Sequence, residues 1–261
     1  MVLFDILVRK DTPLHRVDPR VKIISAILLT FFAFVSSNLL VLVALVIILQ
    51  VMIFSTSVGW RTYSSTIWLV ARLAILFVLL WPFFDQAGEP ILLDLPIYKV
   101  TLPALLDSLV VAFRILLIAS GWLLLMFTTP HSKLVRGMVK LGLPYDIGLS
   151  ITIALRYIPN FIGTISQIKD AQLSRGFDMD KGGPFRRARN YIPVLIPTVA
   201  IALRTAEELS SVLVCRGYGG SVKRTYLKEI HLRGVDTLAV ASVIVLFSLA
   251  IVSRIIWGLP I

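Results

Sequence analysis

The sequence has few charged residues and almost no cysteine. Of its 261 residues only 16% are charged, against about 25% in an average soluble domain, while 57% are hydrophobic. A water-soluble globule does not need several uninterrupted apolar runs of membrane-spanning length, so this class is excluded. The composition therefore predicts a polytopic membrane protein.

Residue types and motifs that the sequence lacks exclude further classes of protein and of binding site. Cys215 is the only cysteine and there are three histidines, which excludes an intrachain disulfide and a Cys-rich metal site. No Gly-x-x-x-x-Gly-Lys-Ser/Thr phosphate loop occurs, so any nucleotide must be bound by another protein. Asp107 is the carboxylate that lies deepest in an expected span, and it is near one end of that span. An ion-coupled carrier would need a carboxylate near the middle of the membrane, so this class is disfavoured. We predict no catalytic residue, no cofactor and no metal.

Five apolar runs are expected to form transmembrane helices. Residues 21–54 would be about 50 Å long as one helix, more than the roughly 30 Å hydrocarbon core requires. Ser36-Ser37-Asn38 is therefore expected to form a tight turn, and Asp18-Pro19 to cap the first helix. The expected spans are 21–35, 39–55, 66–84, 104–128 and 236–257.

The basic residues predict the orientation. The chain has 26 Lys and Arg against 15 Asp and Glu, and sixteen of the basic residues lie in 129–235. Because Lys and Arg near span ends are retained on the cytoplasmic side, this segment and the amino terminus are expected to be cytoplasmic. The connection 85–103 is acidic, which is typical of the outside. We expect a multi-pass protein of the cell membrane with its carboxyl terminus outside.

Segment 129–235 differs from the spans because its apolar residues follow a helical stripe. They recur every three or four positions, while Arg204 and Glu207 fall on the other side. The predicted packing stripe consists of Leu195, Val199, Ala202, Ala206, Leu209 and Leu213. We expect this stripe to pack against the transmembrane helices or a membrane-embedded partner.

Segment 129–235 is also subdivided. Residues 178–190 are expected to form a polar linker, and a re-entrant passage over 141–165 stays open. The prolines expected to separate its helices are Pro144, Pro159, Pro193 and Pro197. The predicted parts are 1–128 with the amino-terminal arm and four spans, 129–235 as a cytoplasmic coupling region, and 236–261 with the last span and tail.

The most informative motif is a repeated Arg-Gly-aromatic triplet. Ser174-Arg175-Gly176-Phe177 and Cys215-Arg216-Gly217-Tyr218 each end an amphipathic helical pattern. Gly after a helix end is an ordinary cap, and a cation there complements the helix dipole. The same arrangement presents a guanidinium beside a residue without a side chain, so it also suits docking into an acidic groove of another protein.

These motifs, together with the runs 12–22 and 141–146, resemble the transmembrane T component of energy-coupling factor (ECF) transporters, which are ABC importers. The resemblance implies two cytoplasmic ABC-type ATPases and a membrane-embedded substrate-binding S component as partners. It also implies vitamins or transition-metal ions such as cobalt and nickel as substrates. The ATPase-docking residues implied by it are Ser174, Arg175, Gly176, Cys215, Arg216 and Gly217.

The interpretation we favour is an all-helical integral membrane protein with about five transmembrane helices and cytoplasmic amphipathic coupling helices. It would be a non-catalytic coupling subunit, with the lipid bilayer but no nucleic acid as a partner. A self-sufficient channel or secondary transporter with a regulatory region stays open, as does a membrane-embedded transferase. Arg72 and Arg114 lie inside expected spans and are predicted to snorkel or to pair within the helix bundle, for example with Asp107.

Overall fold

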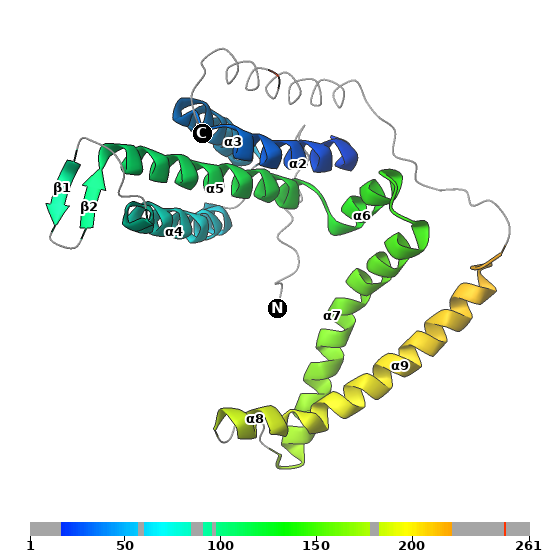
Figure 1. Cartoon of the computed structure of the whole chain (residues 1–261). Coiled ribbons are helices and arrows are strands. Elements are labelled where there is room, and N and C mark those ends of the chain that lie inside the picture. The colour runs from blue at the N-terminus through cyan, green and yellow to red at the C-terminus, as the bar shows by residue number, and fades with distance from the viewer. Residues whose placement is uncertain are drawn as a thin grey trace. The chain divides into compact units, whose positions relative to one another are not determined.

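The computed structural model describes residues 17–56, 60–84, 91–95, 98–177, 183–220 and 248. These residues are helical apart from one two-stranded hairpin (Figure 1). In chain order the elements are α2 (Pro19–Val35), α3 (Leu39–Ser55), α4 (Trp60–Phe84), β1 (Ile91–Leu95), β2 (Tyr98–Thr101), α5 (Leu102–Thr128), α6 (His131–Lys140), α7 (Tyr145–Ser174), α8 (Pro184–Asn190) and α9 (Ile192–Cys215). One compact unit holds α2 to α6, and the other, Pro144–Glu229, holds α7 to α9.

The first helix begins at its predicted cap, and the second begins at the end of the predicted turn. Asp18 Oδ1 accepts a hydrogen bond from the backbone N–H of Arg20 at 2.9 Å, and Pro19 opens α2. Asn38 Oδ1 likewise accepts from the N–H of Leu40 at 3.0 Å at the start of α3. Such side chains satisfy N–H groups that have no partner inside the helix. The predicted division of the long apolar run is confirmed.

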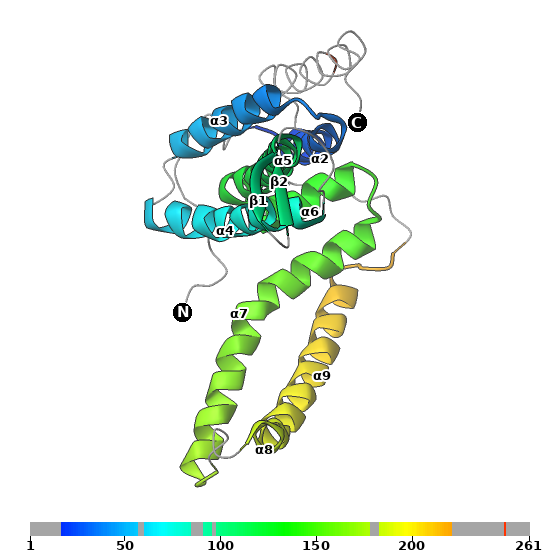
Figure 2. The ribbon, with the colours of Figure 1, turned by 60° about the vertical axis from the view of Figure 1, so that its left-hand side comes forward.

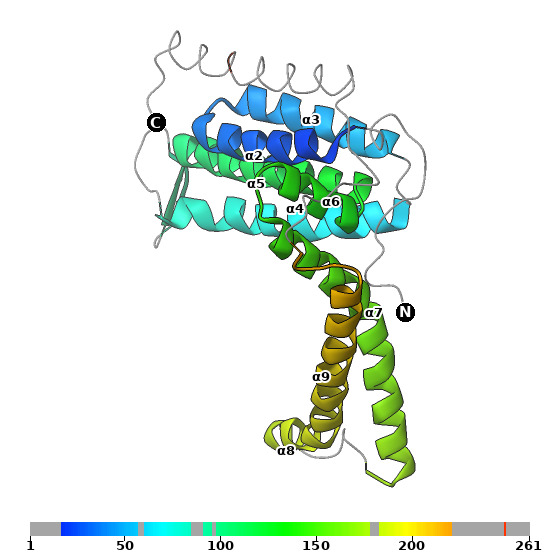
Figure 3. The ribbon, with the colours of Figure 1, turned by 90° about the vertical axis from the view of Figure 1, so that its right-hand side faces the viewer.

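Helix α5 is the centre of the first unit. It lies between the α2–α3 pair and α4 (Figures 1 and 3). The buried apolar side chains between α2, α3 and α5 are Phe32, Ala33, Leu42, Leu45, Val46, Leu49 and Leu117. Helix α6 packs on the start of α2, where a Cβ on Gly137 would lie 3.1 Å from Pro19 Cβ. Close helix packing at a small residue is typical of membrane bundles.

Polar side chains connect the helices within this apolar bundle. Tyr63 OH in α4 donates to Gln50 Oε1 in α3 at 2.6 Å, and Gln50 Nε2 donates to Ser120 Oγ in α5 at 3.0 Å. Arg114 Nη2 donates to the backbone oxygen of Ser36 at 3.2 Å. Arg114 therefore pairs within the helix bundle, with the α2–α3 turn rather than with Asp107, which is exposed.

Two described helices are long and apolar enough to cross a membrane. They are Tyr63–Trp81 within α4 and Leu102–Thr128, which is α5. Helix α3 is apolar but has only 17 residues. The expected span at 236–257 lies outside the described residues. Five spans therefore stay a prediction.

Three local features differ from the predictions. The connection 85–103 contains the antiparallel hairpin β1–β2, in which Leu95 pairs with Tyr98, and its sequence was not expected to form strands. The expected linker 178–190 was wrong over α8, which begins at Pro184 because proline is well suited to a first helical turn. Pro159 and Pro197 lie inside α7 and α9 rather than between helices.

Candidate docking site

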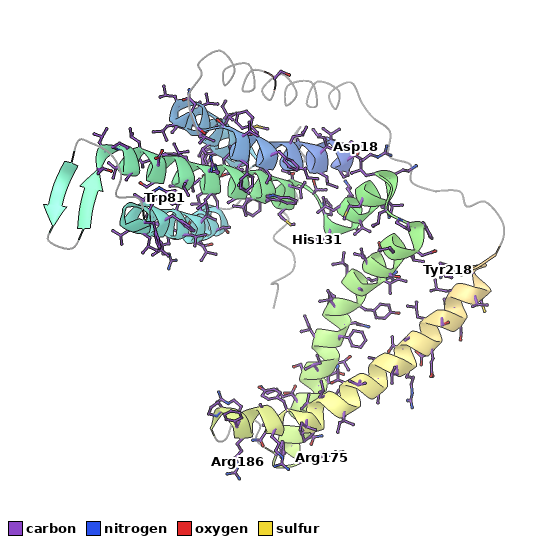
Figure 4. The ribbon with its side chains drawn as sticks, in the orientation of Figure 1. Asp18, Trp81, His131, Arg175, Arg186 and Tyr218 are labelled. Atoms are coloured by element: carbon purple, nitrogen blue, oxygen red, sulfur yellow. The ribbon has the colours of Figure 1, made fainter. Side chains whose placement is uncertain are left out.

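Helices α7 and α9 run side by side in opposite directions (Figures 1 and 2). At one end Gln172 Nε2 donates to the backbone oxygen of Pro193 at 3.4 Å, so the end of α7 adjoins the start of α9. At the other end Tyr218 OH donates to Asp146 Oδ1 at 2.9 Å, next to the start of α7. Figure 4 accordingly shows Arg175 and Tyr218 at opposite ends of the pair.

The two triplets therefore lie far apart within one helix pair. Helix α7 has 30 residues, which at the helical rise is about 45 Å. The first tip (174–177) ends α7, and the second tip (215–218) ends α9 near Asp146. The tips are thus about 40 Å apart. One groove of ordinary size cannot hold both.

The first tip is a Schellman cap. The N–H of Phe177 donates to the oxygen of Gln172 at 3.0 Å, and the N–H of Gly176 donates to that of Leu173 at 2.9 Å. Gly176 has φ +81°, the left-handed conformation that this cap requires. Arg175 is the last residue before the reversal. The capping role considered from the sequence is confirmed here.

The second tip repeats this geometry. The N–H of Tyr218 donates to the oxygen of Leu213 at 2.9 Å, and the N–H of Gly217 donates to that of Val214 at 2.9 Å. Gly217 has φ +76°. Arg216 occupies the same position as its counterpart in the first tip. The backbone therefore presents two arginines in the same way.

A third cap of this kind ends α6 without an arginine. Gly142 has φ +118°, and the N–H of Leu143 donates to the oxygen of Met138 at 3.0 Å. The residue before the glycine is Leu141. The cap alone is therefore not specific to the tips, and the arginine is the distinguishing feature. This third cap offers an internal control for experiments.

Both tips are open to another molecule. All six residues of the predicted docking set, 174–176 and 215–217, are exposed. Among the described residues, no hydrogen bond or ion pair engages the guanidinium of Arg175 or Arg216. A Cβ added at Gly176 or Gly217 would meet nothing within 4 Å. Each tip thus presents five N–H donors at an unobstructed turn.

The predicted packing stripe divides between two environments. Ala202, Leu209 and Leu213 are half-buried, whereas Leu195 and Val199 are 61% and 49% exposed. Ala206 is exposed as well. A neighbouring helix that packs at an angle covers only part of any one stripe. Periodicity could not predict which part.

The start of α9 instead carries an apolar surface with little cover from the described residues. We call it the exposed α9 face, and it consists of Ile192, Leu195, Ile196, Val199 and Leu203. Val194 is the one buried residue described in α9, and Gly148, which has no side chain, is the one described in α7. Few buried residues together with exposed apolar side chains are typical of a helix pair that packs against another protein surface or the membrane.

Sequence reasoning missed the contact between Asp146 and Tyr218. The two residues are 72 positions apart, so no local pattern joins them. Asp146 belongs to the run 141–146. The resemblance of this run to the T component of ECF transporters was the only signal in the sequence that drew attention to Asp146. The described residues contain no group of three or more His, Cys, Asp or Glu side chains that could hold a metal ion.

Comparison with known proteins agrees with the resemblance. The family described as "CbiQ: Cobalt transport protein" matches residues 10–227. The energy-coupling factor transporter transmembrane protein EcfT of Thermanaerovibrio acidaminovorans is 32% identical over 229 residues, covering 85% of this chain and 84% of that protein. The protein of the same name from Clostridium kluyveri is 28% identical over 256 residues and covers 95% of each chain. The chain therefore belongs to the CbiQ family of transporter membrane components, which includes the T components of ECF transporters.

Proposed function

We propose that this chain couples two cytoplasmic ABC-type ATPases to a membrane-embedded S component. The observation that carries the proposal is the pair of matching tips, each with an exposed arginine on a Schellman cap, at opposite ends of α7 and α9. The chain itself has no phosphate loop. Its role is to transmit motion, and hydrolysis belongs to the ATPases.

The spacing of the tips favours two separate sockets. Because Arg175 and Arg216 are about 40 Å apart, each tip engages its own ATPase. A guanidinium fits a carboxylate by two parallel hydrogen bonds, so the socket is an acidic groove. Removing one partner of such a buried charge pair costs about 2–5 kcal/mol, much of it because the other charge is left unpaired, so each arginine is expected to be a sensitive point of its interface. The docking set is residues 174–176 and 215–217.

Helices α7 and α9 carry the motion. Closure of the ATPases on ATP changes the distance between the sockets, and the bonds of Gln172 and Tyr218 keep the two helices together while the tips move. The exposed α9 face lies on the same helix as the second tip, and we assign it to packing with the S component or transmembrane helices. Leu195 and Val199 of the predicted packing stripe lie on this face.

We further propose a multi-pass topology with five spans, a cytoplasmic amino terminus and an external carboxyl terminus. The basic residues of 129–235 support this orientation. The imported substrates are water-soluble vitamins or transition-metal ions, and the family description names cobalt.

The test uses this chain reconstituted with its ATPases and S component. Arg175→Ala or Arg216→Ala should weaken ATPase association at least about 30-fold, the equivalent of about 2 kcal/mol. The double variant should abolish uptake while the protein remains in the membrane. Association is measured by titration of labelled ATPases, and uptake by transport of radiolabelled substrate into vesicles.

Arg189→Ala is the matched control. Arg189 is also an exposed arginine, in the last turn of α8, but it lies on no glycine cap. This variant should associate and transport as the unmodified chain does. If the double variant takes up substrate as the unmodified chain does, the tips serve only as helix caps and the proposal is refuted.

A further inference from the structure

One side of α4 is exposed from Trp68 to Leu79, within the candidate span, and carries a single charge. Its residues recur every three or four positions and therefore lie on one side of the helix. Trp68 and Leu69 are 60% and 65% exposed. Arg72, one helical turn further along α4, is exposed as well. We call this the Arg72 face, and it consists of Trp68, Leu69, Arg72, Ile75, Leu76 and Leu79.

The depth of Arg72 makes its charge expensive. It lies midway along the candidate span Tyr63–Trp81, about 14 Å from either end. Long basic side chains near helix ends reach the interface, but a charge at the bilayer centre is costly unless it is paired. Among the described residues, no hydrogen bond or ion pair joins the Arg72 guanidinium to another group. Arg114 in α5, by contrast, donates to the oxygen of Ser36.

The apolar helices of this chain bring no carboxylate to that depth. The sequence has no Asp or Glu in 19–84, 108–145 or 237–261. Asp107 is exposed and lies close to the start of α5. Among the described residues, no carboxylate therefore lies at the depth of Arg72, and a counter-charge from another molecule would satisfy it.

We propose that the Arg72 face docks a transmembrane helix of a partner protein that carries an Asp or Glu at mid-bilayer depth. The carboxylate would accept two parallel hydrogen bonds from the guanidinium, and the surrounding apolar residues would pack against the rest of the helix. This proposal requires that α4 lies in the bilayer. It holds whether or not the tips bind ATPases.

The test measures disulfide formation between the full chain and a synthetic membrane-spanning peptide. The chain carries Cys215→Ser and Leu76→Cys, one turn from Arg72, and is reconstituted in phosphatidylcholine vesicles. The peptide is a Leu-rich helix of about 20 residues with one central Glu and one Cys a turn away. The Glu peptide should cross-link about tenfold more than a Gln peptide, the equivalent of 1.4 kcal/mol. Arg72→Leu should remove this difference, and Arg72→Lys should keep part of it.

Two controls make the result specific. Ile47→Cys in α3 is also on an exposed apolar helix, without a charge, and should cross-link to both peptides equally weakly. Arg72→Glu should prefer a peptide with a central Lys, because the charges are exchanged.

Three results would overturn the proposal. Equal cross-linking of the Glu and Gln peptides would mean that lipid phosphate or water satisfies Arg72. Failure of Leu76→Cys to react with any peptide would mean that this chain covers its own face. Disulfide-linked dimers that form in preference to peptide adducts would identify a second copy as the occupant.

Discussion

The cap at the first tip gives a prediction that separates shape from charge. Gly176 has φ +81°, and a Cβ there would meet no atom within 4 Å. Gly176→Ala therefore adds no clash, and its cost is the left-handed conformation itself, about 1–2 kcal/mol. The guanidinium of Arg175 is retained. A loss of function in this variant would come from the geometry of the tip.

The expected loss is measurable at one amide. The N–H of Phe177 donates to the oxygen of Gln172 only while the cap is formed, so its hydrogen exchange reports local opening. A cost of 1–2 kcal/mol should make that exchange about 5- to 30-fold faster. ATPase association, measured by titration, should weaken by up to the same factor because fewer tips are in the docking conformation. Gly176→Asn should have a smaller effect, since Asn tolerates this conformation.

Gly142→Ala in the third cap is the matched control. It imposes the same type of strain at φ +118° and also meets no atom within 4 Å, but its cap carries no arginine. Local exchange at Leu143 should accelerate while ATPase association stays unchanged. Unchanged exchange at Phe177 in Gly176→Ala would refute the strain argument. Faster exchange with wild-type association would refute the need for a rigid tip.

Two further predictions concern the first unit. Tyr63→Phe removes the hydroxyl that donates to Gln50 and should cost about 0.6–1.7 kcal/mol in a denaturant titration in detergent; a change below about 0.2 kcal/mol would show that the bond contributes nothing. Gly137→Ala forces a Cβ to 3.1 Å from Pro19 and should destabilise by about 1–2 kcal/mol, because overpacking outweighs the gain in helix propensity. Gly163→Ala, which meets nothing within 4 Å, should instead stabilise α7, and stabilisation by both changes would contradict the packing argument.

Local features were readable from the sequence because their interactions join residues a few positions apart. Asp18 caps α2 through the N–H of Arg20, two residues on. The glycines of both tips end their helices by bonds that span five residues or fewer. Composition likewise predicted the apolar helices α3 and α5. Hydrogen bonding over short separations and overall apolarity are properties of the chain itself.

The direction of the tips and the burial of the stripe depended on tertiary structure. The antiparallel course of α7 and α9 brings Tyr218 to Asp146, 72 positions away, and so separates the two arginines. Leu195 is exposed whereas Leu209 is half-buried, although both follow the same helical period. Periodicity fixes the face on which a residue lies, while the partner of that face depends on how whole helices pack.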